Sequence, residues 1–139
     1  MKESFSTYFL DVLKNNYANF NGRARRSEYW MFALWNAVII TALSIIMGII
    51  AAITNTMSLI LVAYLPVFAF LIPQLALMSR RLHDVGKSGW FYFVSIIPLV
   101  GTIWLLVLLV SDSMFGDNQY GADPKADERI QFQASKPEV

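Results

Sequence analysis

The sequence contains no cysteine and only one histidine. The absence of cysteine excludes disulfides, thiolate metal ligands and a cysteine nucleophile. A single histidine, His83, also excludes a metal site built from several histidines of one chain. We therefore predict no metal ion, no cofactor and no catalytic centre of these kinds, and we expect no nucleic-acid partner.

Charge is scarce as well, at 15% of residues, and none lies between Glu28 and Arg80. An ordinary soluble domain is nearer one quarter charged. The hydrophobic fraction is 56% and the mean hydropathy +0.48, in a chain of 139 residues that has room for one domain. The remaining residues are too few to cover so much apolar surface in water. We therefore predict an all-α integral membrane protein.

Three apolar segments are long enough to cross a bilayer, which takes about 20 residues. The polar triplet Thr54-Asn55-Thr56 divides the first uncharged run into spans at residues 30–53 and 57–78, joined as a hairpin. A later uncharged run contains a third span at residues 90–110. The first 28 residues are too polar for a cleavable signal peptide, so we expect these segments in the mature protein.

The distribution of lysine and arginine predicts the orientation, because cytoplasmic loops carry an excess of both. Five of these residues precede the first span and three follow the second, whereas the hairpin loop has none. Three full spans then place the N-terminus in the cytoplasm and the C-terminus outside. Interfacial aromatic residues mark both edges, with Tyr29 and Trp30 at the first span and Trp90 at the third.

Pro98 lies within the third span, where proline removes a helix hydrogen bond. We expect a kinked full span here. The alternative is a re-entrant hairpin that turns at residues 97–101 and returns the tail to the cytoplasm. Each arm would then be about 15 Å long, half the hydrocarbon thickness, and its irregular backbone would need shelter from protein.

The two ends of the chain have different predicted structures. Residues 5–20 place aromatic and aliphatic side chains on one helical stripe, which is typical of an amphipathic helix in the cytoplasmic interface. A helix packed on the base of the bundle explains the stripe equally well. Residues 116–139 are rich in turn formers and charge, and we expect this tail to be mostly disordered.

Gly86-Lys87-Ser88 resembles part of a phosphate loop, but Arg81 stands where that motif needs glycine, so we reject it. Ser88 is expected to cap the third span, and the N–H groups around Gly86 and Gly89 to form an anion site with Lys87. Two basic loops meet at one cytoplasmic rim, which we predict to bind an anionic lipid headgroup or a partner protein. The predicted rim residues are Arg23, Arg25, Arg26, Glu28, Arg80, Arg81, His83, Asp84, Lys87 and Ser88.

Two simpler interpretations apply to the same rim. The arginines can serve only as a topology signal, and the acids only as partners for them. We expect Glu28 to pair with Arg80 or Arg81, and Asp84 with Arg81 or Lys87. A phospholipid-modifying enzyme that uses Glu28, His83 and Asp84 is the third-ranked function.

Small residues recur every three to four positions along the first span, a spacing that lets helices approach closely. The predicted packing residues are Ala37, Thr41, Ser44, Gly48 and Ala52. Their partner is either the second span or another copy of the chain. A subunit of an oligomeric channel or transporter is therefore the second-ranked function, after a non-enzymatic membrane module.

Three blocks of sequence together resemble a known family: residues 20–30 (FNGRARRSEYW), 80–90 (RRLHDVGKSGW) and 116–124 (GDNQYGADP). They are similar to the domain of unknown function 805 family, small bacterial inner-membrane proteins of the YhaH/YhaI type. The resemblance covers residues 17–124. It implies a multi-pass inner-membrane protein and no established activity. It also implies that the third block belongs to the working unit, and docking on the other two would favour the re-entrant topology.

Overall fold

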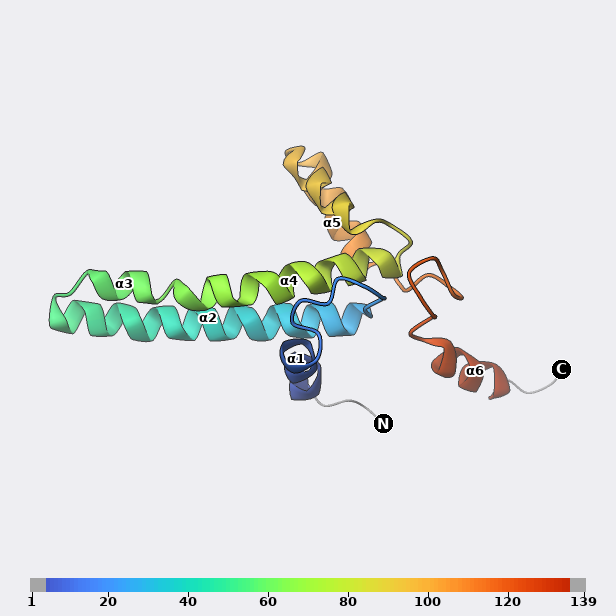
Figure 1. The fold of residues 1–139 in the computed structure, drawn as a ribbon, viewed down its shortest axis with the longest axis horizontal. Coiled ribbons are helices and arrows are strands. Elements are labelled where there is room, and N and C mark those ends of the chain that lie inside the picture. The colour runs from blue at the N-terminus through green and yellow to red at the C-terminus, as the bar shows by residue number, and fades with distance from the viewer. Residues whose placement is uncertain (1–4, 136–139) are drawn as a thin grey trace.

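The computed structural model describes residues 5–135, and Figure 1 shows them as a long helical hairpin with smaller elements at one end. The helices are α1 (Phe5–Lys14), α2 (Arg26–Thr54), α3 (Ser58–Val62), α4 (Leu65–Asp84), the 3-10 helix η1 (Gly89–Ile96), α5 (Val100–Val110) and α6 (Ala126–Ala134). Within the described residues there is no β-strand, only an isolated bridge between Asn118 and Gly121. The predicted all-α class is confirmed.

The hairpin consists of α2 on one side and α3 with α4 on the other. Its turn falls at the predicted triplet, where Asn55 takes the left-handed conformation (φ 52°) and its N–H donates to the Ala51 carbonyl. Pro66 in the first turn of α4 separates that helix from α3, because proline has no N–H to continue the α3 ladder. Both sides are long and apolar enough to span a membrane.

Burial distinguishes this hairpin from the core of a soluble protein. In the most apolar part of α2 only 6% of residues are buried, and in that of α3 and α4 only 17%. The side chains that point outward are large and aliphatic, such as Ile53 (79% exposed) and Leu61 (70% exposed). Such a surface is stable in hydrocarbon and costly in water.

The third apolar run differs from the kinked full span we preferred, because the chain reverses direction at residues 97–99. The ring centroids of Phe91 in η1 and Trp104 in α5 lie 5.4 Å apart. A Cβ on Gly101 would lie 1.8 Å from the Val94 carbonyl oxygen, so the two arms pack closely at this glycine. Pro98 prevents a continuous helix, and Leu99 turns the chain at a positive φ of 64°. The result is a short hairpin, visible beside the end of α4 in Figure 1.

Helix α1 packs on the base of the long hairpin and ends at Lys14, earlier than the predicted residue 20. The ring of Phe9 stacks on Phe32 at 5.2 Å and approaches Phe70 at 6.0 Å, and Val12 is fully buried. The packed alternative therefore describes this helix.

The tail differs from the expected disorder over the residues that the structure describes. Residues 111–125 run back across the end of α4, and α6 follows them. Their contacts are made with side chains far away in the sequence, which form the site described next.

Candidate functional site at the end of helix α4

Three segments of the chain meet at the C-terminal end of α4. The Ala24 N–H donates to the Arg80 carbonyl (3.0 Å), and the Met114 N–H donates to the Asp84 carbonyl (3.0 Å). The Asn118 side chain donates to the His83 carbonyl (2.9 Å). A helix C-terminus leaves four carbonyls without helical partners, and here the other two segments donate to three carbonyls near that end, those of Arg80, His83 and Asp84. These contacts join all three of the sequence blocks that carry the family resemblance.

Asp84 is the centre of a fully buried ionic cluster. Its carboxylate accepts from Arg23 Nε at 3.0 Å and from the guanidinium of Arg81, and none of the three side chains is more than 1% exposed. We call Arg23, Arg81 and Asp84 the Asp84 cluster. The expected pair of Asp84 with Arg81 is confirmed, whereas the second arginine was not predicted as its partner.

The other donors of these arginines are taken by backbone carbonyls. Arg23 donates to the carbonyls of Met114 and Gly116, both at 2.7 Å. Arg81 donates to the carbonyls of Leu109 (3.2 Å) and Ser111 at the C-terminus of α5. A buried cation is favourable at this helix end, where unpaired carbonyls carry partial negative charge. The Asp84 cluster therefore fixes both the tail and α5 to α4.

Glu28 and Arg80 form a second buried pair at 3.0 Å, as predicted from their opposite charges at the same rim. His83, at the same end of α4, has its Nδ1 3.1 Å from the Gly22 carbonyl oxygen. Its ring is stacked on Tyr120 of the tail, with centroids 3.8 Å apart and planes within 1°. Glu28, His83 and Asp84 are thus engaged in structural contacts within the chain.

The remaining predicted rim residues face outward or contact the tail. Arg25 pairs with Glu128 of α6. Arg26 and Lys87 are exposed, and the Lys87 ammonium lies 5.9 Å from the Phe91 ring centroid. Ser88 caps η1 by accepting from the Trp90 N–H at 3.4 Å.

At the expected anion site around Gly86 and Gly89, two backbone N–H groups donate to carbonyls of the preceding turn. The Gly86 N–H donates to the His83 carbonyl and the Lys87 N–H to the Leu82 carbonyl. Lys87 is the exposed cation of this loop.

The small-residue stripe does not pack against the second span. The stripe residues of α2 are all exposed, and a Cβ on Gly48 would meet nothing within 4 Å. They are Ala37, Thr41, Ser44, Gly48 and Ala52. In this chain the stripe is therefore open to a further partner.

An open cavity of about 560 Å³ lies between the loop before α2, one face of α4 and the start of η1. We call it the interfacial groove. Most of its surface is apolar, and a few polar groups come from the rim. The lining residues are Phe20, Asn21, Leu75, Ser79, His83, Ser88, Gly89, Trp90, Tyr92 and Phe93. Aromatic rings with adjacent polar groups are typical of the headgroup level of a bilayer.

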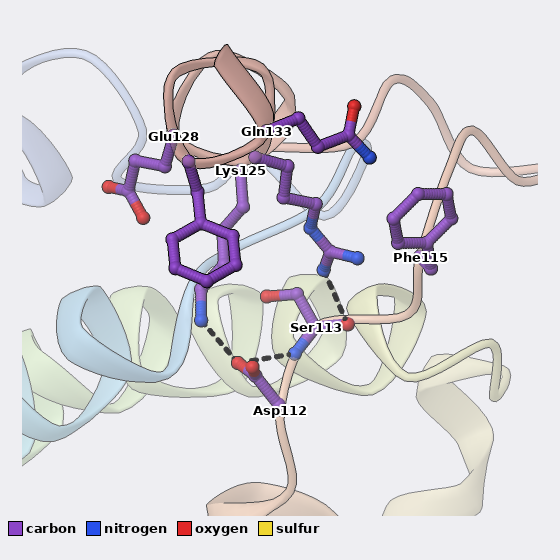
Figure 2. A pocket seen from close by; sticks show the side chains of 8 residues that line it. Asp112, Ser113, Phe115, Lys125, Glu128 and Gln133 are labelled. Carbon is purple, nitrogen blue, oxygen red and sulfur yellow. Dashed lines mark hydrogen bonds and ion pairs between the residues drawn. The ribbon is translucent and has the colours of Figure 1, made fainter. Parts of the chain in front are cut away.

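Sequence reasoning missed a second cavity, of about 410 Å³, between α6 and the segment after α5. Figure 2 shows Lys125, the residue before α6, extending to Asp112, with Ser113 beside them. The hydrogen bond from Lys125 lowers the pKa of the Asp112 carboxyl. Arg129 donates to the Ser113 carbonyl at 2.9 Å. Only the third block of the family resemblance pointed to this region.

Asp123 anchors the same region. Its carboxylate accepts from the N–H groups of Gly116 (3.0 Å) and Lys125 (2.9 Å) and lies 3.3 Å from Arg129 Nε. Burial acts to raise its pKa, but the two N–H donors and the cations Arg129 and Arg23 outweigh burial, so the pKa is lowered. Asp123 is therefore ionised in the docked tail at neutral pH.

The long apolar hairpin and the buried ionic cluster at one end define a small multi-pass membrane protein. Residues 17–122 match the family model described as protein of unknown function (DUF805). The chain belongs to this family, and the resemblance drawn from the three blocks is confirmed.

Two relatives from Escherichia coli strain K12 support a location in the inner membrane. The chain is 42% identical over 124 residues to inner membrane protein YhaI, covering 85% of this chain and 95% of the relative. It is 36% identical over 118 residues to inner membrane protein YhaH, covering 85% and 96%. No solved structure matches the chain. The protein is an inner-membrane protein of a family without an assigned activity.

Proposed function

We propose that the protein is a non-enzymatic membrane module that binds an anionic phospholipid in the interfacial groove. The observation that carries this proposal is the composition of the groove, which combines aromatic walls with a polar end formed by Asn21, His83 and Ser88. Lys87 is exposed beside it. An amphiphile with a phosphate group and an acyl chain matches these two surfaces.

The ionic contacts reduce the number of predicted rim residues that are free to bind a lipid headgroup. Arg23, Arg80 and Arg81 are buried and paired with acids of the same chain. They hold the rim together and are not exposed to lipid. The exposed cation next to the groove, Lys87, therefore supplies the attraction for the phosphate.

The test compares lipid binding in a lysine variant with that in a matched control. Native mass spectrometry would count phosphatidylglycerol and phosphatidylcholine bound to the detergent-solubilised protein and to Lys87→Gln. A lysine near anionic lipid contributes about 1 kcal/mol, or roughly fivefold in affinity. We expect the preference for phosphatidylglycerol to fall by about this factor.

Lys14→Gln is the control, because Lys14 is an exposed lysine at the end of α1 and does not line the groove. It should keep the preference of the unmodified protein. An unchanged preference in Lys87→Gln would contradict the proposal.

We also propose that both chain ends lie in the cytoplasm, with residues 89–110 as a re-entrant hairpin, the arrangement that was the alternative from the sequence. Three observations support this topology. The N-terminal loop, the Arg80 loop and the tail are joined by direct hydrogen bonds. Both arms of the short hairpin start from the same end of α4, since Gly89 lies against Ser79 and Leu109 lies against Arg81.

The backbone at the hairpin tip supports the same topology. The N–H groups of Ile97, Val100 and Gly101 donate to nearby carbonyls within the tip, and Pro98 has no N–H. Unpaired backbone groups are what make irregular structure costly in lipid. The tip satisfies most of its own groups and so needs little shelter from other helices.

A second candidate function is a subunit of a homo-oligomeric channel or transporter. The exposed stripe on α2 favours it, because small residues allow a second copy to approach closely. Crosslinking between cysteines placed at Gly48 of two copies would support this candidate. A strictly monomeric protein in native membranes would exclude it.

A further inference from the structure

The guanidinium of Arg80 uses only one of its edges in the ion pair with Glu28. Its Nη1 faces the Glu28 carboxylate. Within the part of the chain that the structure describes, Nε and Nη2 have no hydrogen-bond partner, although the residue is only 5% exposed. These two N–H groups point in the same direction and form the fork with which arginine binds pairs of oxygen atoms.

Among residues 5–135, the buried side-chain oxygens without a hydrogen-bond partner include Oε1 of Gln74 on α4 and Oδ1 of Asn36 on α2. The Gln74 side chain is also hydrogen-bonded to Tyr29. Gln74 is six residues from Arg80, or about 9 Å along the helix, and Asn36 is eight residues from Glu28, or about 12 Å. We call Glu28, Arg80, Gln74 and Asn36 the polar seam, because they lead from the rim into the membrane-spanning part of the hairpin.

The polar seam is sheltered from lipid by α1. Phe9 of that helix stacks on Phe32 and contacts Trp35 and Phe70, at the same level of the hairpin as Asn36 and Gln74. At the rim, the Glu28 side chain keeps 16% of its surface exposed. Helix α1 therefore covers one side of the polar seam, and Glu28 keeps a small exposed surface at the rim.

We infer that the polar seam binds a chain of water molecules that is continuous with water at the Glu28 rim and reaches Asn36. The Arg80 fork offers donors, and the Gln74 and Asn36 oxygens offer acceptors. A water molecule both donates and accepts, so it can link the two kinds of group, and buried waters commonly satisfy such atoms. The protein then contains a hydrated entrance from the rim, separate from the interfacial groove and independent of lipid binding there.

The absence of native cysteine makes the test direct. Asn36→Cys and Gln74→Cys would be treated in inverted membrane vesicles with a membrane-impermeant methanethiosulfonate. The thiolate is the reactive form and is suppressed in apolar surroundings. The matched control is Ala37→Cys, whose position is exposed on the lipid-facing surface one residue from Asn36.

We expect both seam cysteines to react at least about tenfold faster than the cysteine at position 37. Equal rates at positions 36 and 37 would overturn the inference. Asn36→Leu provides a second measurement that needs no thiol. If water meets the Asn36 oxygen, this variant lowers the melting temperature, whereas a higher melting temperature would show that the polar seam is dry.

Discussion

At the scale of single residues, the stability of the rim depends on three buried charges. Arg23 and Arg81 both pair with Asp84, and no part of the cluster is open to water. Removing one partner of a buried ion pair leaves a charge uncompensated and costs about 3–5 kcal/mol. An exposed pair contributes about 0–1 kcal/mol. The two kinds of pair at this rim should therefore respond very differently to substitution.

We predict that Asp84→Asn lowers the free energy of unfolding by about 3–5 kcal/mol, because two arginines lose their carboxylate. The control is Glu128→Gln, which breaks the ion pair between Arg25 and Glu128, a glutamate whose side chain is 59% exposed. This variant should change the free energy of unfolding by less than about 1 kcal/mol. Circular dichroism during thermal and denaturant unfolding in mild detergent measures both. Similar small effects in the two variants would contradict this account of the rim.

At the scale of elements, the sequence predicted best where the signal was local. The long uncharged run and the triplet at residues 54–56 predicted the hairpin of α2 with α3 and α4 and its turn. The opposite charges of Glu28 and Arg80 predicted their pairing. In each case the residues that carry the sequence pattern are the same residues that form the structural feature.

The features that the sequence did not predict as the first choice depend on distant contacts. The reversal at Pro98 becomes clear only when Gly101 is seen against the Val94 carbonyl. The tail is polar and rich in turn formers, as disordered segments are. Its start is held in place because Arg23, more than 90 residues earlier, donates to the carbonyls of Met114 and Gly116. No local pattern in the sequence of the tail predicts that contact.

Docking of the tail should depend on pH through Asp123. Because its pKa in the folded protein is lowered from the ordinary value of 3.8, its stabilising contribution is complete above that value and is lost as the pH falls through the lowered pKa. We predict that a spin label on Gln131→Cys of α6 becomes mobile as the pH falls below about 3.8.

Asp123→Asn imitates the protonated form and should give the mobile spectrum already at pH 7. Asp127→Asn serves as the control, because Asp127 is exposed in the first turn of the same helix. It should leave the label as immobile as in the unmodified chain. An immobile label in Asp123→Asn would contradict this role.

At the scale of the whole molecule, the contacts of the rim constrain the orientation of the chain in the membrane. The tail meets the N-terminal loop in the structure, so both must lie on the same side of a bilayer whenever the docked form exists. We predict that a fluorescent protein fused after Val139 folds and fluoresces in the cytoplasm.

A phosphatase fused at the same point, which is active only outside the cytoplasm, should be inactive. The same reporters inserted at Asn55 in the hairpin turn give the opposite pattern and serve as the control. An active phosphatase at the C-terminus would exclude the re-entrant arrangement of residues 89–110.

The buried arginines also bear on how the nascent chain inserts into the membrane. Arg23 and Arg81 are translated before Met114 and Gly116, and before the last turn of α5, whose carbonyls they later bind. At about 5–20 residues per second, the nascent chain exists for seconds without these acceptors. During that interval the guanidinium groups are still hydrated, and they can hold their loops back from translocation. In the proposed topology, the same side chains direct insertion early and become interior parts of the folded protein later.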